Sequence, residues 1–310
     1  MLSQVIESHD LIDDAYVDGR KVADAFKARG LKNVETITIR GEKGKTDFVN
    51  VLIPGKNGKS VKGNAPTLGI IGRLGGIGAR PERIGIVSDA DGAITMLAAA
   101  FKLADMAKKG DALNGDVILA THICPDAPTQ PHEPVPFMKS PVPMQEINKH
   151  EVTPAMDAIL SVDSTKGNRL LNWKGIAITP TVKEGYILKV SEDLLNILSW
   201  TTGGVPRVIA ITTQDITPYE NGLYHMNSIL QPCTATTAPV VGVAVTAEST
   251  VPGCGTGASH EVDIELAARF CIEVAKTFTE HKCGFYDKEE FNKLVSLYGE
   301  MKILQTPGKK

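Results

Sequence analysis

The feature of this sequence that most constrains its fold is the alternation of strand and helix patterns after Ile84. Short, continuous apolar runs such as DVILATHI (116–123) and VVGVAV (240–245) are separated by Ala-rich or amphipathic segments of helical length. Continuous apolar strands are typical of a mostly parallel sheet that is covered on both faces. The sequence therefore predicts an α/β fold, a three-layer α/β/α sandwich with a mostly parallel central sheet.

The remaining elements frame this core. Residues 1–33 carry apolar positions at helical spacing up to Gly30, which predicts two N-terminal helices. Three β-like runs indicate a meander that leads into the main sheet, and they cover 34–39, 47–53 and 67–72. Further helices are expected near 92–109, 192–202, 260–281 and 287–303, before a short polar tail at 304–310. We interpret residues 1–310 as a single α/β domain.

Composition limits the partners and the location of the protein. The formal net charge of -3 and the lack of a basic cluster interleaved with aromatic residues argue against nucleic acid as a partner. No run of about 18 uncharged apolar residues occurs and the N-terminus is polar, so neither a membrane span nor a secretion signal is expected. Five widely spaced cysteines without a CxxC pair indicate a reducing compartment. These features predict a cytoplasmic protein that binds neither nucleic acid nor membrane.

One segment, residues 121–144, departs from the regular pattern because it holds seven of the eighteen prolines. Proline excludes both a helix and a central strand, so a long loop is expected there. The loop begins where a predicted strand ends, which is where ligands bind in open α/β sheets. It carries the polar residues His122, Cys124, Asp126, His132 and Glu133. Two interpretations stay open: a functional loop, or a stiff arm that packs against a neighbouring subunit.

The run GIVSDADGAITMLAAAFKLA (85–104) predicts a buried strand that passes directly into a helix. Asp89 and Asp91 lie at this junction. An acidic residue there can cap the helix, worth roughly 0.3–1 kcal/mol when exposed. Alternatively, a carboxylate fixed at a strand end can bind a metal ion. The spacing alone favours capping.

Three parts of the chain resemble the zinc exopeptidase superfamily, which includes the glutamyl and tetrahedral aminopeptidases and the succinyl-diaminopimelate desuccinylase-like deacylases. They are VETITIRGEKGKTDFVNVLIPGKNGK with PTLGIIGRLGGIG and GIVSDADGAITMLAAAFKLA, then AILSVDST, and then PVVGVAVTAESTVPGCGTGASHEVDIELAARFCIEVAK. The resemblance implies a divalent metal, zinc, with Asp89 at the position that bridges two metal ions in the superfamily and with Asp163 and His260 as further ligands. It further implies a homo-oligomer, because members of that superfamily often oligomerise. The whole chain also resembles uncharacterised bacterial and archaeal families of similar length.

The chain departs from the superfamily pattern at two motifs. Where the superfamily has His-x-Asp, this chain reads GRLGG (72–76), so Arg73 replaces the first imidazole ligand. An arginine fork can instead hold the carboxylate of a substrate. Where the superfamily has a Glu-Glu pair, the chain reads THICPD (121–126), which contains no glutamate.

The proline-rich loop is the candidate source of replacements for the missing glutamates. His122 and Cys124, with Asp126 or His132, are candidate metal ligands, and Asp126 or Glu133 is the candidate general base that takes a proton from a metal-bound water.

Several of these residues also have plain structural interpretations. Asp163 precedes Ser-Thr and suits a turn, and His260 suits the first turn of a helix capped by Ser259. The glycine-rich run around residues 69–85 lacks the spacing of phosphate-binding fingerprints. Cys254, between glycines, suits a turn better than a nucleophile.

Two hypotheses about function follow from these patterns. The first is a metal-dependent hydrolase of amide bonds in short peptides, N-acyl amino acids or related carboxylates, with a degenerate metal site. The alternative is a non-catalytic small-molecule-binding or scaffold protein that retains the exopeptidase fold, because a fold does not determine a function.

Overall fold

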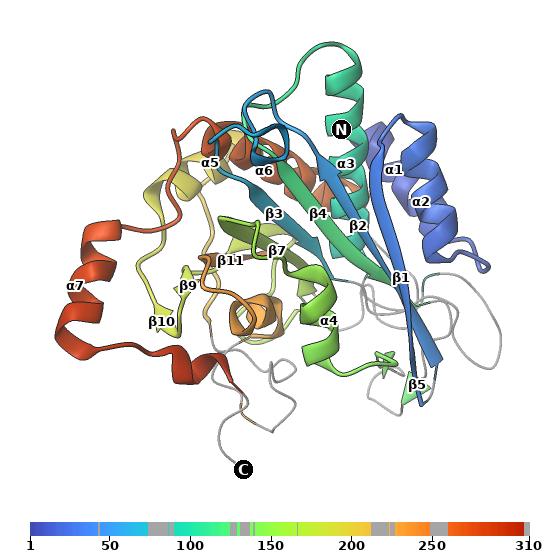
Figure 1. The fold of residues 1–310 in the computed structure, drawn as a ribbon. Coiled ribbons are helices and arrows are strands. Elements are labelled where there is room, and N and C mark those ends of the chain that lie inside the picture. Colours follow the sequence, from blue (N-terminus) through green and yellow to red (C-terminus); the bar gives the residue numbers. More distant parts are fainter. Residues whose placement is uncertain are drawn as a thin grey trace.

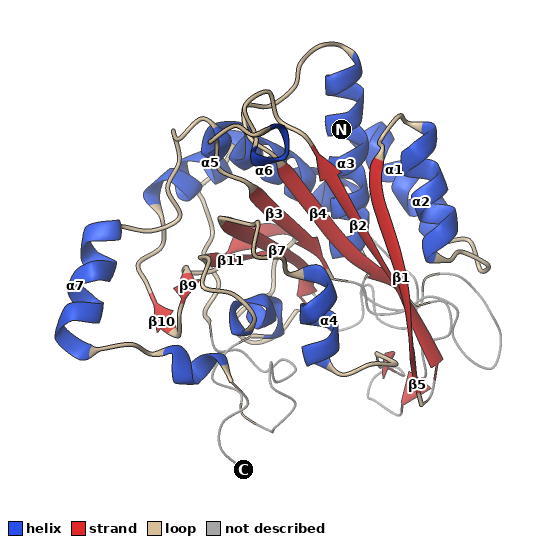
Figure 2. Cartoon of the chain, in the orientation of Figure 1, coloured by secondary structure: helices blue, strands red, loops and turns tan. Residues whose placement is uncertain are grey.

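The computed structural model describes residues 1–42, 44–73, 86, 90–124, 140–165, 167–211, 223, 227–248 and 260–306, and the backbone of 129–130 and 137–138. In these residues a broad twisted sheet runs through the molecule with helices packed against its faces (Figure 1, Figure 2). Most of the helices lie behind the sheet in these views, and α4 (Met144–Glu151) lies in front of it.

The main sheet contains nine described strands in the order β1-β2-β4-β3-β7-β11-β9-β10, with β8 also paired to β11. The strands are β1 (Asn33–Gly41), β2 (Gly44–Ile53), β3 (Leu68–Gly72), β4 (Val117–Ile123), β7 (Ala158–Thr165), β8 (Gly175–Ile178), β9 (Val182–Lys183), β10 (Tyr186–Ile187) and β11 (Val240–Thr246). β4, β3, β7 and β11 run parallel to one another, and the other strands join antiparallel. β5 (Thr129–Gln130) and β6 (Phe137–Met138) form a separate pair. The predicted α/β class with a mostly parallel core is confirmed.

The predicted meander is wrong beyond its first hairpin. β1 and β2 pair antiparallel as expected, but the second neighbour of β2 is β4. β3 is inserted between β4 and β7 in parallel pairing. All five residues of β3 are buried, and such a continuously apolar strand needs covered faces at the centre of a sheet.

One face of the sheet is covered by five helices that enclose the main hydrophobic core. They are α1 (Leu2–Ile12), α2 (Gly19–Ala28), α3 (Asp91–Lys108), α5 (Glu192–Thr202) and α6 (Glu261–Thr279). α3 is buried along almost its whole length, because its alanines allow close approach to the sheet and to α6. α5 ends at Gly203, which adopts a left-handed conformation with φ 68°. These helices confirm the predictions from helical periodicity.

The opposite face has a thinner cover made of α4, the 3-10 helix η2 (Ser228–Thr234) and irregular segments. A second hydrophobic cluster lies here, with Ile71 and Ile159 of the sheet against Ile229 and Leu230 of η2. Phe48 packs against Ile147 of α4 in a smaller cluster. The helix α4 was not among the predicted elements.

Two of the predicted strands do not appear as strands in the described residues. The run RIGIV (83–87) lies outside the described residues except for Ile86. The run VIAITT (208–213) is described only as far as Ile211, and there it makes an isolated bridge between Val208 and Ile178. None of the described helices is long and apolar enough to span a membrane.

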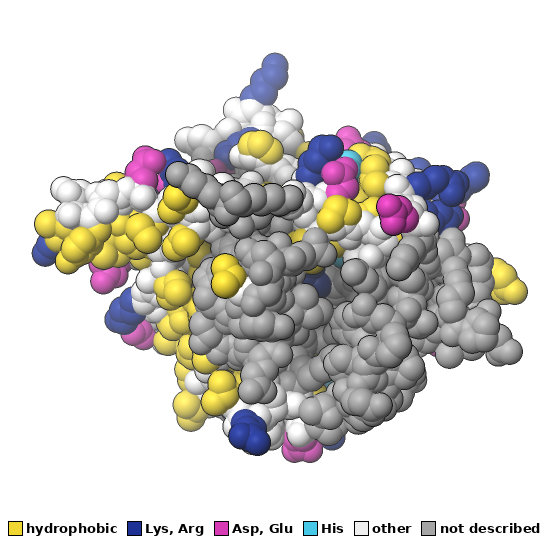
Figure 3. All heavy atoms as spheres, turned by 90° about the horizontal axis from the view of Figure 1, so that it is seen from below, with side chains coloured by type: hydrophobic (Ala, Val, Ile, Leu, Met, Phe, Trp, Pro, Cys, Tyr) yellow, Lys and Arg dark blue, Asp and Glu magenta, His cyan; other side chains and the backbone are white. Residues whose placement is uncertain are grey.

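α7 (Lys288–Tyr298) extends from the body of the molecule beyond β10 (Figure 1). Asp287 caps it by accepting hydrogen bonds from the amides of Glu289 and Glu290. Hydrophobic side chains gather on this side of the molecule (Figure 3), including the exposed Leu297 and Tyr298. Exposed apolar surface of this kind is typical of contacts with other proteins, and the homo-oligomer stays a prediction.

Candidate functional site

A row of polar side chains lies where three parallel strands end. β3 ends in register with Thr121 of β4 and with Val162 of β7. The next residues along these strands are His122, Arg73 and Asp163, so they lie side by side across the sheet. Side chains alternate between the faces of a strand, and Ile71 and Ala120, two positions before Arg73 and His122, lie in the hydrophobic cluster that includes residues of η2. Arg73 and His122 themselves contact Glu151 of α4. The row therefore points towards α4 and η2.

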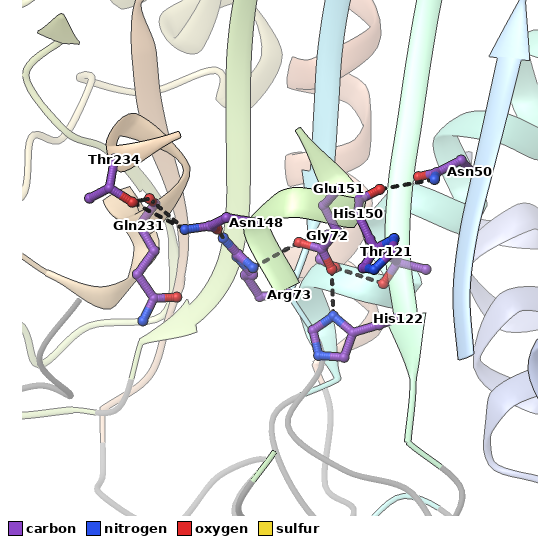
Figure 4. Close-up of polar contacts among 10 residues, drawn as sticks. All are labelled: Asn50, Gly72, Arg73, Thr121, His122, Asn148, His150, Glu151, Gln231 and Thr234. Atoms are coloured by element: carbon purple, nitrogen blue, oxygen red, sulfur yellow. Dashed lines mark hydrogen bonds and ion pairs between the residues drawn. The ribbon is translucent and has the colours of Figure 1, made fainter. Parts of the chain in front are cut away.

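Glu151, the last residue of α4, joins two members of this row (Figure 4). One carboxylate oxygen, Oε2, accepts a hydrogen bond from Arg73 Nη1 at 2.7 Å. The other, Oε1, pairs with His122 Nδ1. All three side chains are buried, with Glu151 fully enclosed. A single carboxylate thus serves two cationic side chains.

The charge on His122 follows from this arrangement. Burial alone lowers the pKa of His122, but its attraction to Glu151 and its interactions with Cys124 outweigh burial and raise the pKa to about 10. His122 is therefore protonated at neutral pH. Arg73 and His122 therefore share the one carboxylate of Glu151, and Cys124 adds to the attraction on His122.

Asn148 completes the group that we call the Arg73 cluster, which consists of Arg73, His122, Asn148 and Glu151. Asn148 Oδ1 accepts from Arg73 Nη2 at 2.9 Å. Its Nδ2 donates to the carbonyl oxygen of Gln231 at 3.1 Å and to Thr234 Oγ1 at 3.2 Å. Arg73 Nε is buried and has no hydrogen-bond partner within the described part of the chain. The guanidinium is therefore fixed through both terminal nitrogens while Nε remains available as a donor.

Asn148 and Glu151 are absent from the predicted site. They lie three residues apart on α4 and therefore share one face of the helix. The only signal in the sequence is a short helical stretch after Pro143, and nothing in it indicates that the stretch packs over the strand ends.

The contacts of the aspartates near the start of α3 differ in part from those that the sequence predicts. Asp91 is the first residue of α3, and the N-cap position is Ala90, without a side-chain cap. The capping prediction is wrong for Asp91, because its carboxylate accepts a hydrogen bond from Ser164 Oγ of β7 at 2.9 Å. Asp163 Oδ1 accepts from the backbone amide of Ser164 at 2.9 Å. Asp89 lies outside the described residues.

His260 is the N-cap residue of α6, one position before the predicted first turn. Burial raises the pKa of the nearby Asp263 above its ordinary value, although the charges of His260 and Lys174 oppose this rise. Asp263 also accepts a backbone hydrogen bond from Gly175, the residue of β8 that pairs with the end of β11. His260 therefore lies at the same edge of the sheet as the Arg73 cluster.

The predicted metal ligands fit a metal ion unequally. His122 Nδ1 is paired with Glu151, so only its Nε2 could face a metal ion, as in the carboxylate–histidine–metal arrangement, and its role as a ligand stays a prediction. Cys124 is buried, with its Sγ 3.1 Å from Thr46 Oγ1. Across the described ranges, no three His, Cys, Asp or Glu side chains gather as a metal site would require. The predicted Asp126, His132, Glu133 and Cys254 lie outside those ranges.

The fold and the site define an α/β protein with a buried charged cluster at the C-terminal edge of its parallel strands. Residues 37–308 match the family described as "Protein of unknown function (DUF1177)", and the chain belongs to this family. No curated protein matches the chain.

Two solved structures are similar in fold. One is a glutaminyl cyclase from an Acidobacteriales bacterium, with a TM-score of 0.49, 11% identity, and coverage of 90% of this chain and 94% of that chain. The other is the bottromycin maturation enzyme BotP in complex with Mn, with a TM-score of 0.45, 11% identity, and coverage of 86% and 71%. Likenesses this remote assign no activity to the chain.

Proposed function

We propose that the protein binds a small molecule through its carboxylate at the Arg73 cluster and hydrolyses an amide bond in that molecule. The observation that carries the binding part is the state of Arg73. Its terminal nitrogens are held by Glu151 and Asn148, and its buried Nε has no partner in the described chain. A buried donor left unpaired is unfavourable by about 1–3 kcal/mol, so a ligand acceptor at this position gains that amount.

Charge supports the same conclusion. Within the Arg73 cluster, Arg73 and His122 share the single carboxylate of Glu151, and burying charge without full compensation is costly. A ligand carboxylate would add negative charge beside Arg73. Arginine and carboxylate also match in shape, because two parallel N–H···O bonds can form. Short peptides and N-acyl amino acids are small substrates that offer such a group.

The hydrolytic part is supported by the resemblance of the strand that ends near Asp163, and of the helix that follows His260, to the zinc exopeptidases. In this proposal Asp89, Asp163 and His260 would hold a zinc ion, which supplies a polarised water for attack on the amide. The Arg73 cluster contributes the anchoring of the substrate, since holding one end fixes the distance of the amide from the reacting groups. Asp126 or Glu133 is proposed as the general base.

A second candidate is a carboxylate-binding protein without catalysis. It is favoured by Arg73, which stands where the superfamily has an imidazole ligand. The scarcity of grouped metal-binding side chains in the described residues favours it as well.

Calorimetry with N-acetylalanine and with its carboxamide, N-acetylalanine amide, tests the proposal. We expect the acid to bind wild-type protein at least tenfold more tightly, a difference of about 1.4 kcal/mol. Arg73→Lys should remove this preference, because lysine keeps the charge but lacks the fork. Equal binding of acid and amide to a folded wild-type protein would contradict the carboxylate site.

Turnover and metal content separate the two candidates. Release of alanine from a panel of N-acyl amino acids with zinc, manganese or cobalt supports the hydrolase, and binding of the acid without any turnover supports the second candidate. In the hydrolase, Asp163→Asn and His260→Ala should lower the bound zinc measured by elemental analysis. His122→Ala should leave the bound zinc unchanged if Asp89, Asp163 and His260 suffice as ligands, and a loss of zinc would add His122 to the ligand set.

A further inference from the structure

We infer that Asn148 is a positioning residue that sets the affinity of Arg73 for a carboxylate. This inference rests on the proposed function of the site and names the residue that prepares Arg73 for its ligand.

The geometry places Asn148 between Arg73 and the cover of the sheet. The residue is 3% exposed, and its side chain makes one hydrogen bond to Arg73 and two to η2 (Figure 4). η2 is itself braced, because Thr234 Oγ1 donates to the carbonyl oxygen of Gln231 at 2.8 Å and Gln305 Nε2 donates to that of Cys233 at 2.9 Å. Asn148 therefore ties the guanidinium to a second, independently held element.

The chemistry of the amide explains why asparagine suits this position. Its carbonyl accepts from the guanidinium while its NH2 group donates to two oxygens, and neither an aliphatic nor a carboxylate side chain of this size does both. The amide carries no charge. It therefore orients Arg73 without neutralising it, whereas Glu151 already provides one negative charge. A second carboxylate at this position would neutralise the positive charge of Arg73 that the ligand carboxylate is proposed to bind.

The orientation has a consequence for the ligand. Arginine has five N–H donors, one of them on Nε. Glu151 and Asn148 each accept a hydrogen bond from a different terminal nitrogen, and the buried Nε has no partner in the described chain. A carboxylate would approach Arg73 at Nε, while Asn148 holds Nη2 and is itself held by η2.

Asn148→Asp is the decisive variant, with Asn50→Asp as the matched control. Asn50 Nδ2 donates to the carbonyl oxygen of His150 at 3.0 Å, so this asparagine also secures α4 but has no hydrogen bond to Arg73. We expect Asn148→Asp to raise the Kd for N-acetylalanine at least tenfold, with little change for N-acetylalanine amide. Asn50→Asp should leave the ratio of the two Kd values as in the wild type. Equal weakening of both ligands in Asn148→Asp, or no weakening, would overturn the inference.

A measurement without ligand tests the same role. The Nε–H signal of Arg73 in a nitrogen–proton NMR spectrum can be assigned by its loss in Arg73→Lys. We expect Asn148→Ala to broaden this signal, because the guanidinium loses one of the two hydrogen bonds that fix it and becomes more mobile. Asn50→Ala should leave the signal sharp. An unchanged signal in Asn148→Ala would overturn the positioning role. Wild-type protein that binds acid and amide alike would overturn the proposed function instead, and with it the effect on affinity.

Discussion

The replacement Glu151→Gln tests the central feature of the Arg73 cluster, the sharing of one carboxylate by two buried cations. Glutamine has nearly the same size and shape as glutamate, so packing around α4 is retained. The change removes only the negative charge and one acceptor. Arg73 and His122 then remain buried without a counter-charge.

The magnitude follows from the burial of the group. Removing one partner of a buried ion pair destabilises a protein by about 3–5 kcal/mol. Glu151 is fully buried and balances two cations, so we expect the upper part of this range. With a urea dependence of about 1–3 kcal/mol/M, the midpoint of unfolding should fall by at least about 1 M.

The effect should depend on pH through His122. The pKa of His122 in the folded protein is raised from 6.5 to about 10, chiefly by Glu151 against the opposing effect of burial. Between these two values the folded protein holds a proton that the unfolded chain has released. The stabilisation is therefore complete below about pH 6.5 and is lost as the pH rises to about 10. The difference between wild type and Glu151→Gln should shrink over the same interval.

Urea unfolding followed by circular dichroism at several pH values between 6 and 10 measures both effects. Glu146→Gln is the control, because Glu146 lies on the same helix and pairs with His150 at 2.9 Å, but at the surface. Such a pair contributes about 0–1 kcal/mol. A loss in Glu151→Gln no larger than in Glu146→Gln, or a loss that does not diminish with rising pH, would refute the reasoning.

Two further predictions follow from the packing of the described residues. Gly92→Ala should destabilise the fold by about 1–3 kcal/mol, because its Cβ would lie 2.3 Å from the carbonyl oxygen of Val162. Gly204→Ala, whose Cβ meets only a hydroxyl at 3.9 Å, should change the melting temperature little, and equal effects would contradict the packing argument. Three thiols should resist iodoacetamide at pH 8 until urea unfolds the protein, since burial raises the pKa of each to about 12: Cys233, Cys271 and Cys283. Peptide mapping that finds any of them modified in the native protein would contradict this.

The local elements were predictable from the sequence because their signals are local. The helix α5 starts at the capping residue Ser191 and ends at Gly203, and both features are visible as residue types in the chain. The order of strands was less accessible. The insertion of β3 between β4 and β7 depends on contacts between segments that are distant in the sequence. The pattern of apolar residues within a strand does not indicate which other strands pair with it.

Only those residues of the candidate site that lie on the strands of the sheet were predictable from the sequence. Arg73 and His122 follow or end buried strands, and that position is readable in the sequence. Glu151 and Asn148 approach from the other side, on a helix of eight residues whose docking depends on Phe48 and η2. The roles given to Asp89, Asp126 and Glu133 stay predictions, since these residues lie outside the described ranges.

The position of Arg73 also determines where a metal ion can bind at this edge. Two like unit charges 4 Å apart repel by about 4 kcal/mol at an effective dielectric constant of 20, and a divalent ion doubles this value. Arg73 and the protonated His122 occupy the middle and one end of the row, and Asp163 occupies the other end. A divalent ion is therefore disfavoured next to Arg73 and, as long as His122 carries its proton, next to His122. The side of Asp163 remains, and Asp163 is one of the ligands proposed on the superfamily resemblance.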